Sequence, residues 1–271
     1  MVISRLDEQR AELQDSGILD KKIFEIIASQ NDSVPVETVA ERLLQIRSGP
    51  AGILRSVISG FVRHDERVLF TAENELRLTD TGRRFRELLN STFVVVDIET
   101  TGTRTYKDKI TEIAAYKVSG GAIVESFESL VNPGRYIPFN ITKITGITND
   151  MVQDAPVIEH LIFEFLEFLG NGIFVAHNAP FDHRFINAAL DESGYGLLNN
   201  RILCTCKMAR KIYPSFRKYD LETVSSRLGI VNESRHRAAG DAAATASLLI
   251  RMLYDLPEIN IFSLDELFNY A

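Results

Sequence analysis

The sequence predicts an α/β fold with a mixed central sheet, preceded by a small α+β domain. An unbroken apolar run of β-branched and aromatic residues, which begins at Phe93, is typical of a strand buried on both faces. Two more strand patterns follow it, and beyond them short strands alternate with helices, which is the order that produces an α/β sheet. At 271 residues, the chain is long enough for two domains that each have a hydrophobic core.

Residues 1–90 are expected to place helices before a β-hairpin. Residues 1–18 have mixed charge and weak periodicity, which suits a short helix or a partly ordered lead-in. Apolar spacing then predicts helices, with Asp20 as the first N-cap. The predicted ranges are 21–29, 36 to about 48 and 50 to about 64 for helices, 67–78 for the hairpin, and 83–89 for a closing helix.

This order of elements resembles a winged helix-turn-helix domain, and residues 78–82 resemble its corner between wing and closing helix. On the third helix, Arg55, Ser59 and Arg63 share a face that would meet DNA if this is a recognition helix. A solvated helix face is the alternative, because two arginines make a weak basic patch. A domain that binds a protein partner is a third interpretation. The opposite, apolar face of this helix contains Ile53, Val57 and Phe61.

The second part of the chain opens with strands that form an antiparallel meander joined by tight turns. Strand 93–99 comes first, and residues 109–118 and 122–131 follow, with a Gly-Gly hairpin turn between them. Residues 150–170 then have a helical period. Beyond them, the expected strands are 173–176 and 201–204, and the expected helices are about 180–190, 207–212, 220–228, 238–253 and 262–270.

Two acids stand at the end of the first of these strands. Because side chains alternate along a strand, Asp97 and Glu99 point to the same side. Neighbouring carboxylates repel each other unless a positive group lies between them, and a hard divalent cation such as Mg²⁺ or Mn²⁺ suits oxygen ligands. A lone pair of acids is more often an ordinary strand end, so the metal interpretation depends on further residues.

Three further polar residues lie where an element begins or ends. Asp182 follows strand 173–176 at the start of a helix, and Asp241 lies in the first turn of the long helix near the C-terminus. His236 precedes Asp241 by five residues, and at 100° per residue the two would not share a helix face. His236 is therefore expected in the loop that leads into this helix.

Together, these residues resemble the motifs of the DEDDh family of 3′-to-5′ exonucleases, the RNase H-like group that includes the proofreading epsilon subunit of bacterial replicative DNA polymerase. The family's three motifs match residues 97–102 (Asp-Ile-Glu-Thr-Thr-Gly), 177–182 (His-Asn-Ala-Pro-Phe-Asp) and 236–241 (His-Arg-Ala-Ala-Gly-Asp). Residues 144–148 resemble the family's substrate-cleft loop. The resemblance covers about residues 93–253. It implies an RNase H-like mixed five-stranded sheet flanked by helices, in an exonuclease domain at 91–271.

The resemblance also implies an activity: metal-dependent removal of nucleoside 5′-monophosphates from single-stranded or frayed 3′ ends, with DNA favoured, in proofreading or repair. Two divalent cations, Mg²⁺ or Mn²⁺, would be held by Asp97, Glu99, Asp182 and Asp241, and His236 would accept the proton of the attacking water. The candidates for substrate binding are Thr100, Thr101, Gly102, Ile144, Ile147, His177, Asn178 and Phe181.

Two other functions are weighed against this one. A 3′-to-5′ exoribonuclease that trims RNA would use the same acids. A non-catalytic winged-helix DNA-binding regulator would have no need of four acids and a histidine. In either exonuclease, residues 1–90 are expected to bind DNA or a polymerase or other replication or repair partner.

Composition narrows the class of protein further. The net charge of −7 argues against a surface coated with basic groups, but bound metals restore positive potential locally in a nucleic-acid enzyme. No apolar run approaches the length needed to span a membrane, and the first residues lack the basic-then-apolar order of a signal peptide. A cytoplasmic protein is therefore expected. Cys204 and Cys206 are too close together for an ordinary disulfide, which makes them core or strand residues.

Overall fold

The computed structural model describes residues 16–270. The chain divides into two compact units, with the division between Leu88 and Leu89, and each unit has its own sheet. The predicted lead-in falls almost entirely on residues 1–15, which lie outside the described residues. The roles expected for 1–90 and 91–271 stay predictions.

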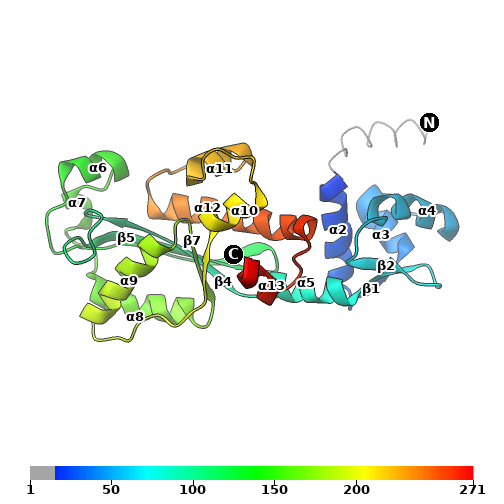
Figure 1. Cartoon of the computed structure of the whole chain (residues 1–271), viewed down its shortest axis with the longest axis horizontal. Coiled ribbons are helices and arrows are strands. Elements are labelled where there is room, and N and C mark those ends of the chain that lie inside the picture. The colour runs from blue at the N-terminus through cyan, green and yellow to red at the C-terminus, as the bar shows by residue number, and fades with distance from the viewer. Residues whose placement is uncertain (1–15, 271) are drawn as a thin grey trace. The chain divides into compact units, whose positions relative to one another are not determined.

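The first unit packs helices against a three-stranded antiparallel sheet in the order β1-β3-β2. Its elements are α2 (Ser16–Ala28), β1 (Ser33–Pro35), α3 (Val36–Leu44), α4 (Ala51–Val62), β2 (Val68–Phe70), β3 (Glu75–Leu78) and α5 (Asp80–Asn90) (Figure 1). The sequence did not predict β1. Its three residues have no strand pattern of their own, and they are extended because Val34 pairs with Leu76 in a fully buried position.

Several predicted helix ends in this unit are wrong. Helix α2 begins at Ser16, so Asp20 lies inside the helix and is not its N-cap. Helix α3 ends at Leu44, because Gln45 adopts a left-handed backbone with φ 57° that cannot continue the helix.

The predicted faces of α4 are also wrong. This helix buries Leu54, Ile58 and Val62, whereas Ile53 is 61% exposed. Arg55 is engaged within the unit: it donates a 2.7 Å hydrogen bond to the Thr71 carbonyl and lies over the Phe70 ring. The winged-helix interpretation of this unit stays a prediction.

Thr79 and Gly82 shape the tight turn that leads from β3 into α5. The Thr79 hydroxyl accepts a 3.1 Å hydrogen bond from the Gly82 amide and donates one of 2.7 Å to the Glu66 carbonyl. A Cβ atom at Gly82 would overlap the Arg67 carbonyl, so only glycine allows the first turn of α5 to approach this closely.

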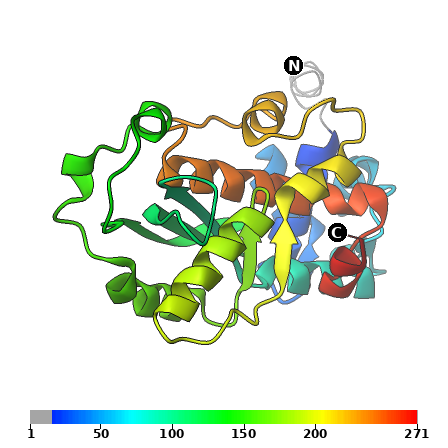
Figure 2. The ribbon, with the colours of Figure 1, turned by 60° about the vertical axis from the view of Figure 1, so that its left-hand side comes forward.

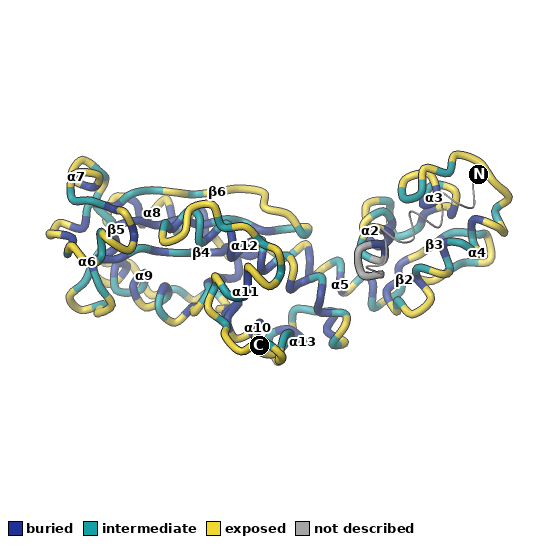
Figure 3. Tube along the Cα trace, turned by 90° about the horizontal axis from the view of Figure 1, so that it is seen from above, coloured by how far each residue is buried: buried dark blue, intermediate teal, exposed yellow. Residues whose placement is uncertain are grey.

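The second unit contains a five-stranded mixed sheet in the order β6-β5-β4-β7-β8. Strands β4 (Phe93–Thr100), β5 (Ile110–Ser119) and β6 (Ala122–Leu130) are antiparallel, whereas β7 (Ile173–Ala176) and β8 (Ile202–Cys204) run parallel to β4. This arrangement confirms the predicted α/β class and the RNase H-like sheet. Strand β4 is buried along most of its length, and β6 is an exposed edge (Figure 3).

Helices cover both faces of this sheet. Helix α12 (Ala238–Asp255) lies on one face, while α8 (Ile158–Leu169) and α9 (Pro180–Glu192) lie on the other (Figures 1 and 2). The remaining elements are α6 (Phe139–Thr145), α7 (Asn149–Val152), α10 (Thr205–Ile212), α11 (Leu221–Arg227), the 3₁₀ helix η1 (Leu256–Ile259) and α13 (Leu264–Tyr270). Cys204 and Cys206 are buried and free, as predicted.

Three expectations for this unit are corrected. The single helix expected at 150–170 is two helices, α7 and α8, because Pro156 lies in the break between them. Strands β4 and β5 are joined by a loop at 101–109 instead of a tight turn. Helix α6 was missed, and it contains Ile144, which was expected in a loop.

Candidate active site

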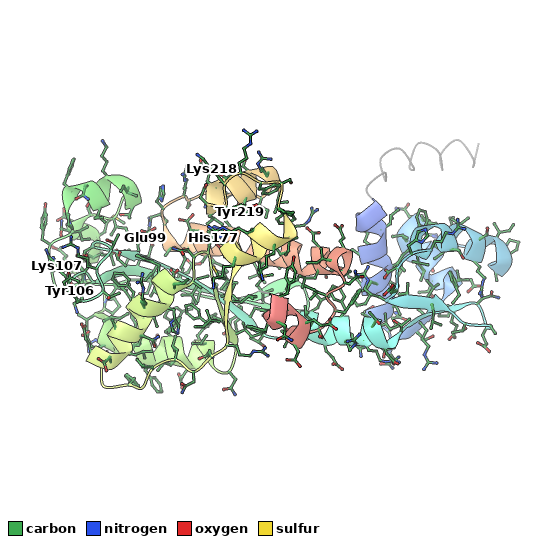
Figure 4. All side chains as sticks on the ribbon, viewed as in Figure 1. Glu99, Tyr106, Lys107, His177, Lys218 and Tyr219 are labelled. Atoms are coloured by element: carbon green, nitrogen blue, oxygen red, sulfur yellow. The ribbon has the colours of Figure 1, made fainter. Side chains whose placement is uncertain are left out.

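The alternation of side chains along β4 separates core residues from acids. Val94, Val96 and Ile98 belong to the core that β4 forms with α8 and α9. Asp97 and Glu99 therefore face the side of the sheet that α12 covers. Figure 4 shows Glu99 between Tyr106 and Lys107 on one side and His177 on the other.

Helix α12 brings the third acid to these two. Asp241 lies in its first turn, and carboxylate oxygens of Asp97, Glu99 and Asp241 lie within 4.8 Å of one another. Ala114, which pairs with Asp97 across β4 and β5, packs against Ala238 and Ala242. Because all three packing residues are alanines, the start of α12 approaches the sheet closely enough for the acids to meet.

Asp182 stands beside this cluster. It lies in the first turn of α9, is 4% exposed, and accepts a hydrogen bond from the backbone of Ile98. The charge of Asp182 raises the pKa of Asp97, which places the two carboxylates near each other. Unlike the other three acids, Asp182 does not have an oxygen within the same 4.8 Å group.

Burial and mutual repulsion disfavour the ionised form of these acids. Burial is the main cause that raises the pKa of Asp97 well above its usual range, followed by the charges of Asp182 and Asp241. Burial, then Asp241, raises the pKa of Glu99 to about 7, and burial raises that of Asp182 to about 8. A divalent cation with oxygen ligands would relieve this repulsion, so the residues present fit a hard metal ion.

The loop before α12 holds Asp241 in place. The Asn232 amide donates a 2.5 Å hydrogen bond to one carboxylate oxygen, and the His236 backbone N–H donates one of 3.1 Å to the other. A Cβ atom at Gly240 would overlap the Ser234 carbonyl, so glycine lets the loop pass close to the helix. His236 is exposed, has a left-handed backbone with φ 58°, and lines a pocket with Asp241, as expected for a loop residue.

Glu112 and Arg237, like Asn232, belong to this site but were not predicted from the sequence. Glu112 pairs with Glu99 across β4 and β5, is 5% exposed, and binds the guanidinium of Arg237 at 2.5 Å. Its other oxygen accepts a 2.8 Å hydrogen bond from the Ala238 amide at the start of α12. Glu112 thus fixes the helix that carries Asp241, but no sequence signal connects residues so far apart.

His177 follows the end of β7, and both of its ring nitrogens are hydrogen-bonded within the protein. Its Nε2 lies 2.8 Å from the Tyr219 carbonyl and its Nδ1 lies 3.0 Å from the Thr205 hydroxyl. Since a carbonyl can only accept, Nε2–H is the donor and Nδ1 accepts from the hydroxyl. Burial lowers the pKa of His177, which agrees with this neutral form. The arrangement indicates a positioning role for the ring.

The segment after Glu99 is tightly held. Thr100 and Thr101 are buried, and Thr101 pairs with Lys109 through its backbone amide and its hydroxyl. A Cβ atom at Gly102 would overlap the Asp108 carboxylate, so glycine permits this close approach. The threonine side chains are therefore engaged within the turn, since the Thr100 hydroxyl also donates a hydrogen bond of 2.5 Å to the Gly102 carbonyl.

The other candidates for substrate binding differ in exposure. Asn178 is exposed with φ 71°, Phe181 is half-buried against Phe185, and Ile144 is 55% exposed. Ile147 is fully buried in a small core, which indicates packing instead of the expected contact with substrate.

A mixed sheet of this order, with carboxylates gathered at the end of its central strand, defines a phosphodiester hydrolase of the RNase H-like class. The profile of an exonuclease family, RNase_T, matches residues 94–249, so the chain belongs to this exonuclease family. The resemblance to 3′-to-5′ exonucleases that the motifs predicted is thereby confirmed. The first unit lies outside the matched residues.

Individual relatives match about two thirds of the chain. The DNA polymerase III subunit epsilon of Aquifex aeolicus is 43% identical over 169 residues, which are 62% of this chain and 84% of the relative. The PolC-type DNA polymerase III of Bacillus subtilis is 42% identical over 183 residues, which are 67% of this chain but only 13% of that relative.

Solved structures with the same fold include two further exonucleases. Exonuclease X in complex with 5′ overhanging duplex DNA has a TM-score of 0.50 and 32% identity, covering 59% of this chain and 90% of the other. The zinc-bound form of E. coli exonuclease I in complex with single-stranded DNA has a TM-score of 0.57 and 19% identity. The match covers 66% of this chain and 43% of the other.

Proposed function

We propose that this 3′-to-5′ exonuclease removes nucleotides one at a time from single-stranded or frayed DNA ends and releases nucleoside 5′-monophosphates. The observation that carries the proposal is the meeting of Asp97, Glu99 and Asp241, from a strand and a distant helix, in one half-buried group. Desolvated acids so close together disfavour the fold unless a cation binds them, so their presence as a group points to a catalytic role.

Asp97, Glu99, Asp182 and Asp241 would hold two divalent cations, Mg²⁺ or Mn²⁺. When bound, such ions supply a polarised water and positive charge at the scissile phosphate. The chain itself contributes the orientation of the ligands: Asn232 and the His236 amide hold the two oxygens of Asp241, and Glu112 fixes the helix that carries it.

His236 accepts the proton of the attacking water in this proposal. Its side chain belongs to an exposed loop residue, and an imidazole nitrogen is the commonest proton acceptor in general acid–base catalysis. The backbone N–H of His236 is bonded to Asp241, which keeps this loop next to the carboxylate group.

The terminal nucleotide would lie against the backbone of residues 100–102, with Asn178, Phe181 and Ile144 around it. His177 would act by holding Tyr219 and Thr205, whose segments border the site. These different roles agree with the surroundings of each side chain. Asn178 and Ile144 are exposed and can contact a nucleotide, whereas His177 has both ring nitrogens engaged within the protein.

The charge distribution near the site supports a nucleic-acid substrate. Residues 193–219 contain six Lys or Arg and no Asp or Glu, although the whole chain has a net charge of −7. Arg217 and Lys218 are exposed next to Tyr219, whose carbonyl binds His177. DNA is favoured over RNA because the similar proteins named above are DNA polymerase subunits and exonucleases bound to DNA.

The first unit would recruit the enzyme to its substrate by binding a polymerase, another replication or repair protein, or duplex DNA. It is a compact unit outside the exonuclease region, and the name of the Aquifex relative associates the exonuclease with a polymerase. A cytoplasmic location stays a prediction. Among the described residues, no helix has the length and apolar character needed to cross a membrane.

A product time course tests this function. DNA and RNA oligonucleotides of the same sequence, labelled at either end, are incubated with the full chain with and without Mg²⁺ or Mn²⁺. We expect stepwise shortening of 5′-labelled DNA, immediate release of mononucleotide from 3′-labelled DNA, and no reaction in EDTA. Internal cuts, faster loss of RNA, or full activity in EDTA would contradict the proposal.

A further inference from the structure

Aromatic side chains gather at one exposed end of the second unit. Tyr106 is 81% exposed, Phe139 77% and Tyr136 71%, which places them among the most exposed large side chains of residues 16–270. Large apolar groups left in solvent in this way mark interaction surfaces when they occur together.

A folded scaffold presents two of these rings. Ile137, Ile147 and Val152 form a small buried core beneath α6 and α7. The Asn149 side chain accepts a 2.8 Å hydrogen bond from the Ile137 amide and donates one of 3.4 Å to its carbonyl. Tyr136 and Phe139, on either side of Ile137, are therefore held outward by packed structure.

The loop that carries Tyr106 is fixed to the same scaffold and to the active site. Arg135 donates a hydrogen bond to the Lys107 carbonyl and lies 3.7 Å from the Asp108 carboxylate. Asp108 in turn fills the space beside Gly102, directly after the catalytic strand. In Figure 4, Tyr106 and Lys107 lie on one side of Glu99, and His177 and Tyr219 lie on the other.

Positive charges alternate with the aromatic rings. Residues 129–149 contain Arg135 and Lys143 and no acid, and Lys143 is exposed one turn from Phe139 on α6. Asp108, the one acid in the neighbouring loop 101–109, is paired with Arg135. Aromatic rings with interspersed cations suit single-stranded nucleic acid, whose bases stack while its phosphates need counter-charges. A protein partner would favour an apolar centre with fewer lysines.

We propose that Tyr106, Tyr136 and Phe139, together with Lys107 and Lys143, form an aromatic platform for unpaired nucleotides of the substrate near its 3′ end. This proposal rests on the proposed function, since it names where that substrate binds outside the catalytic group. Stacking on rings tolerates every base, so the platform would hold a strand regardless of sequence.

The test compares binding of a long strand with turnover of a small substrate, in the full chain. For Tyr136→Ala/Phe139→Ala, we expect the Kd for a fluorescent single-stranded DNA, measured by anisotropy in Ca²⁺, to rise by about tenfold or more. Hydrolysis of the p-nitrophenyl ester of thymidine 5′-monophosphate, which reaches only the catalytic group, should keep its wild-type rate.

Two controls separate stacking from general damage. Tyr136→Phe/Phe139→Tyr keeps both rings and should keep the wild-type Kd. Phe163→Ala removes a ring that is 52% exposed on α8, outside the platform, and should also leave the Kd unchanged. Equal weakening in either control would contradict the proposal.

Photocrosslinking with iodinated deoxyuridine upstream of the 3′ end gives an independent measurement. We expect crosslinks to peptides that contain Tyr106, Tyr136 or Phe139. An unchanged Kd in the double alanine variant, crosslinks elsewhere only, or loss of a dimer in that variant by sedimentation would overturn the platform. If the wild-type chain hydrolyses neither the ester nor DNA, the proposed function fails instead.

Discussion

At the scale of single residues, burial disfavours the ionised form of the carboxylates in the active site. Glu99 and Asp182 have a pKa of about 7 and about 8, above the ordinary values of 4.5 and 3.8, chiefly because they are buried. The folded chain therefore binds protons that the unfolded chain has already released at neutral pH. Metal ions compete with those protons for the same oxygens.

This competition predicts opposite effects of pH with and without metal. Because the pKa values are raised on folding, these groups contribute stability at low pH and lose it as pH rises through about 7 to 8. In EDTA, Tm should fall between about pH 5.5 and about pH 8.5, and the increase in Tm caused by Mn²⁺ should grow over the same range. Asp182→Asn should flatten the fall in EDTA, whereas an equally steep fall would show that Asp182 is not responsible.

His236 should affect turnover and not metal binding. His236→Ala removes the proton acceptor but leaves the four carboxylates, so kcat should fall by about 10²- to 10⁴-fold while the affinity for Mn²⁺ by calorimetry stays the same. The pH-rate profile should lose the limb that reports this base. If the profile of the variant matches that of the wild type, His236 is not the base.

At the scale of elements, one buried ion pair holds the first unit together. Arg67 is 6% exposed, donates two 2.8 Å hydrogen bonds to Asp65, and lies over the rings of Phe24 and Phe85. Asp65→Ala would leave the guanidinium buried without its carboxylate, and should lower the free energy of unfolding by about 3–5 kcal/mol. Urea unfolding measures this change, and a loss similar to that of the exposed control Glu66→Ala would contradict it.

The basic segment at 193–219 should contribute to the salt dependence of DNA binding. Arg217→Gln/Lys218→Gln removes two exposed charges beside the site, so the slope of log Kd against log salt should decrease by about 0.7 for each phosphate that the variant no longer neutralises. Lys22→Gln on α2 is the control and should keep the slope. An unchanged slope in the double variant would place the strand elsewhere.

Elements with a strong local pattern were predictable, and those that depend on distant partners were not. Strand β4 and the start of α12 follow from an apolar run and an alanine-rich helix, so Asp97, Glu99 and Asp241 could be placed correctly. Strand β1 escaped prediction because a three-residue strand depends on its pairing with β3. The break before α8 had a local signal in Pro156, which the helical period of the flanking residues obscured. Glu112 escaped prediction because its partner Arg237 is 125 residues away.

At the scale of the whole molecule, the chain combines a family exonuclease domain with a separate compact unit. The sheet brings the end of β4 next to the starts of α9 and α12, so acids from three parts of the sequence share one location. Every catalytic role assigned to the chain depends on that location accepting divalent cations.

Anomalous diffraction from crystals of the full chain soaked in Mn²⁺ tests that dependence most directly. We predict manganese peaks within bonding distance of carboxylate oxygens of Asp97, Glu99 and Asp241, and their loss in crystals of Asp97→Asn. Peaks found only away from these residues, or an unchanged peak in Asp97→Asn, would contradict the account.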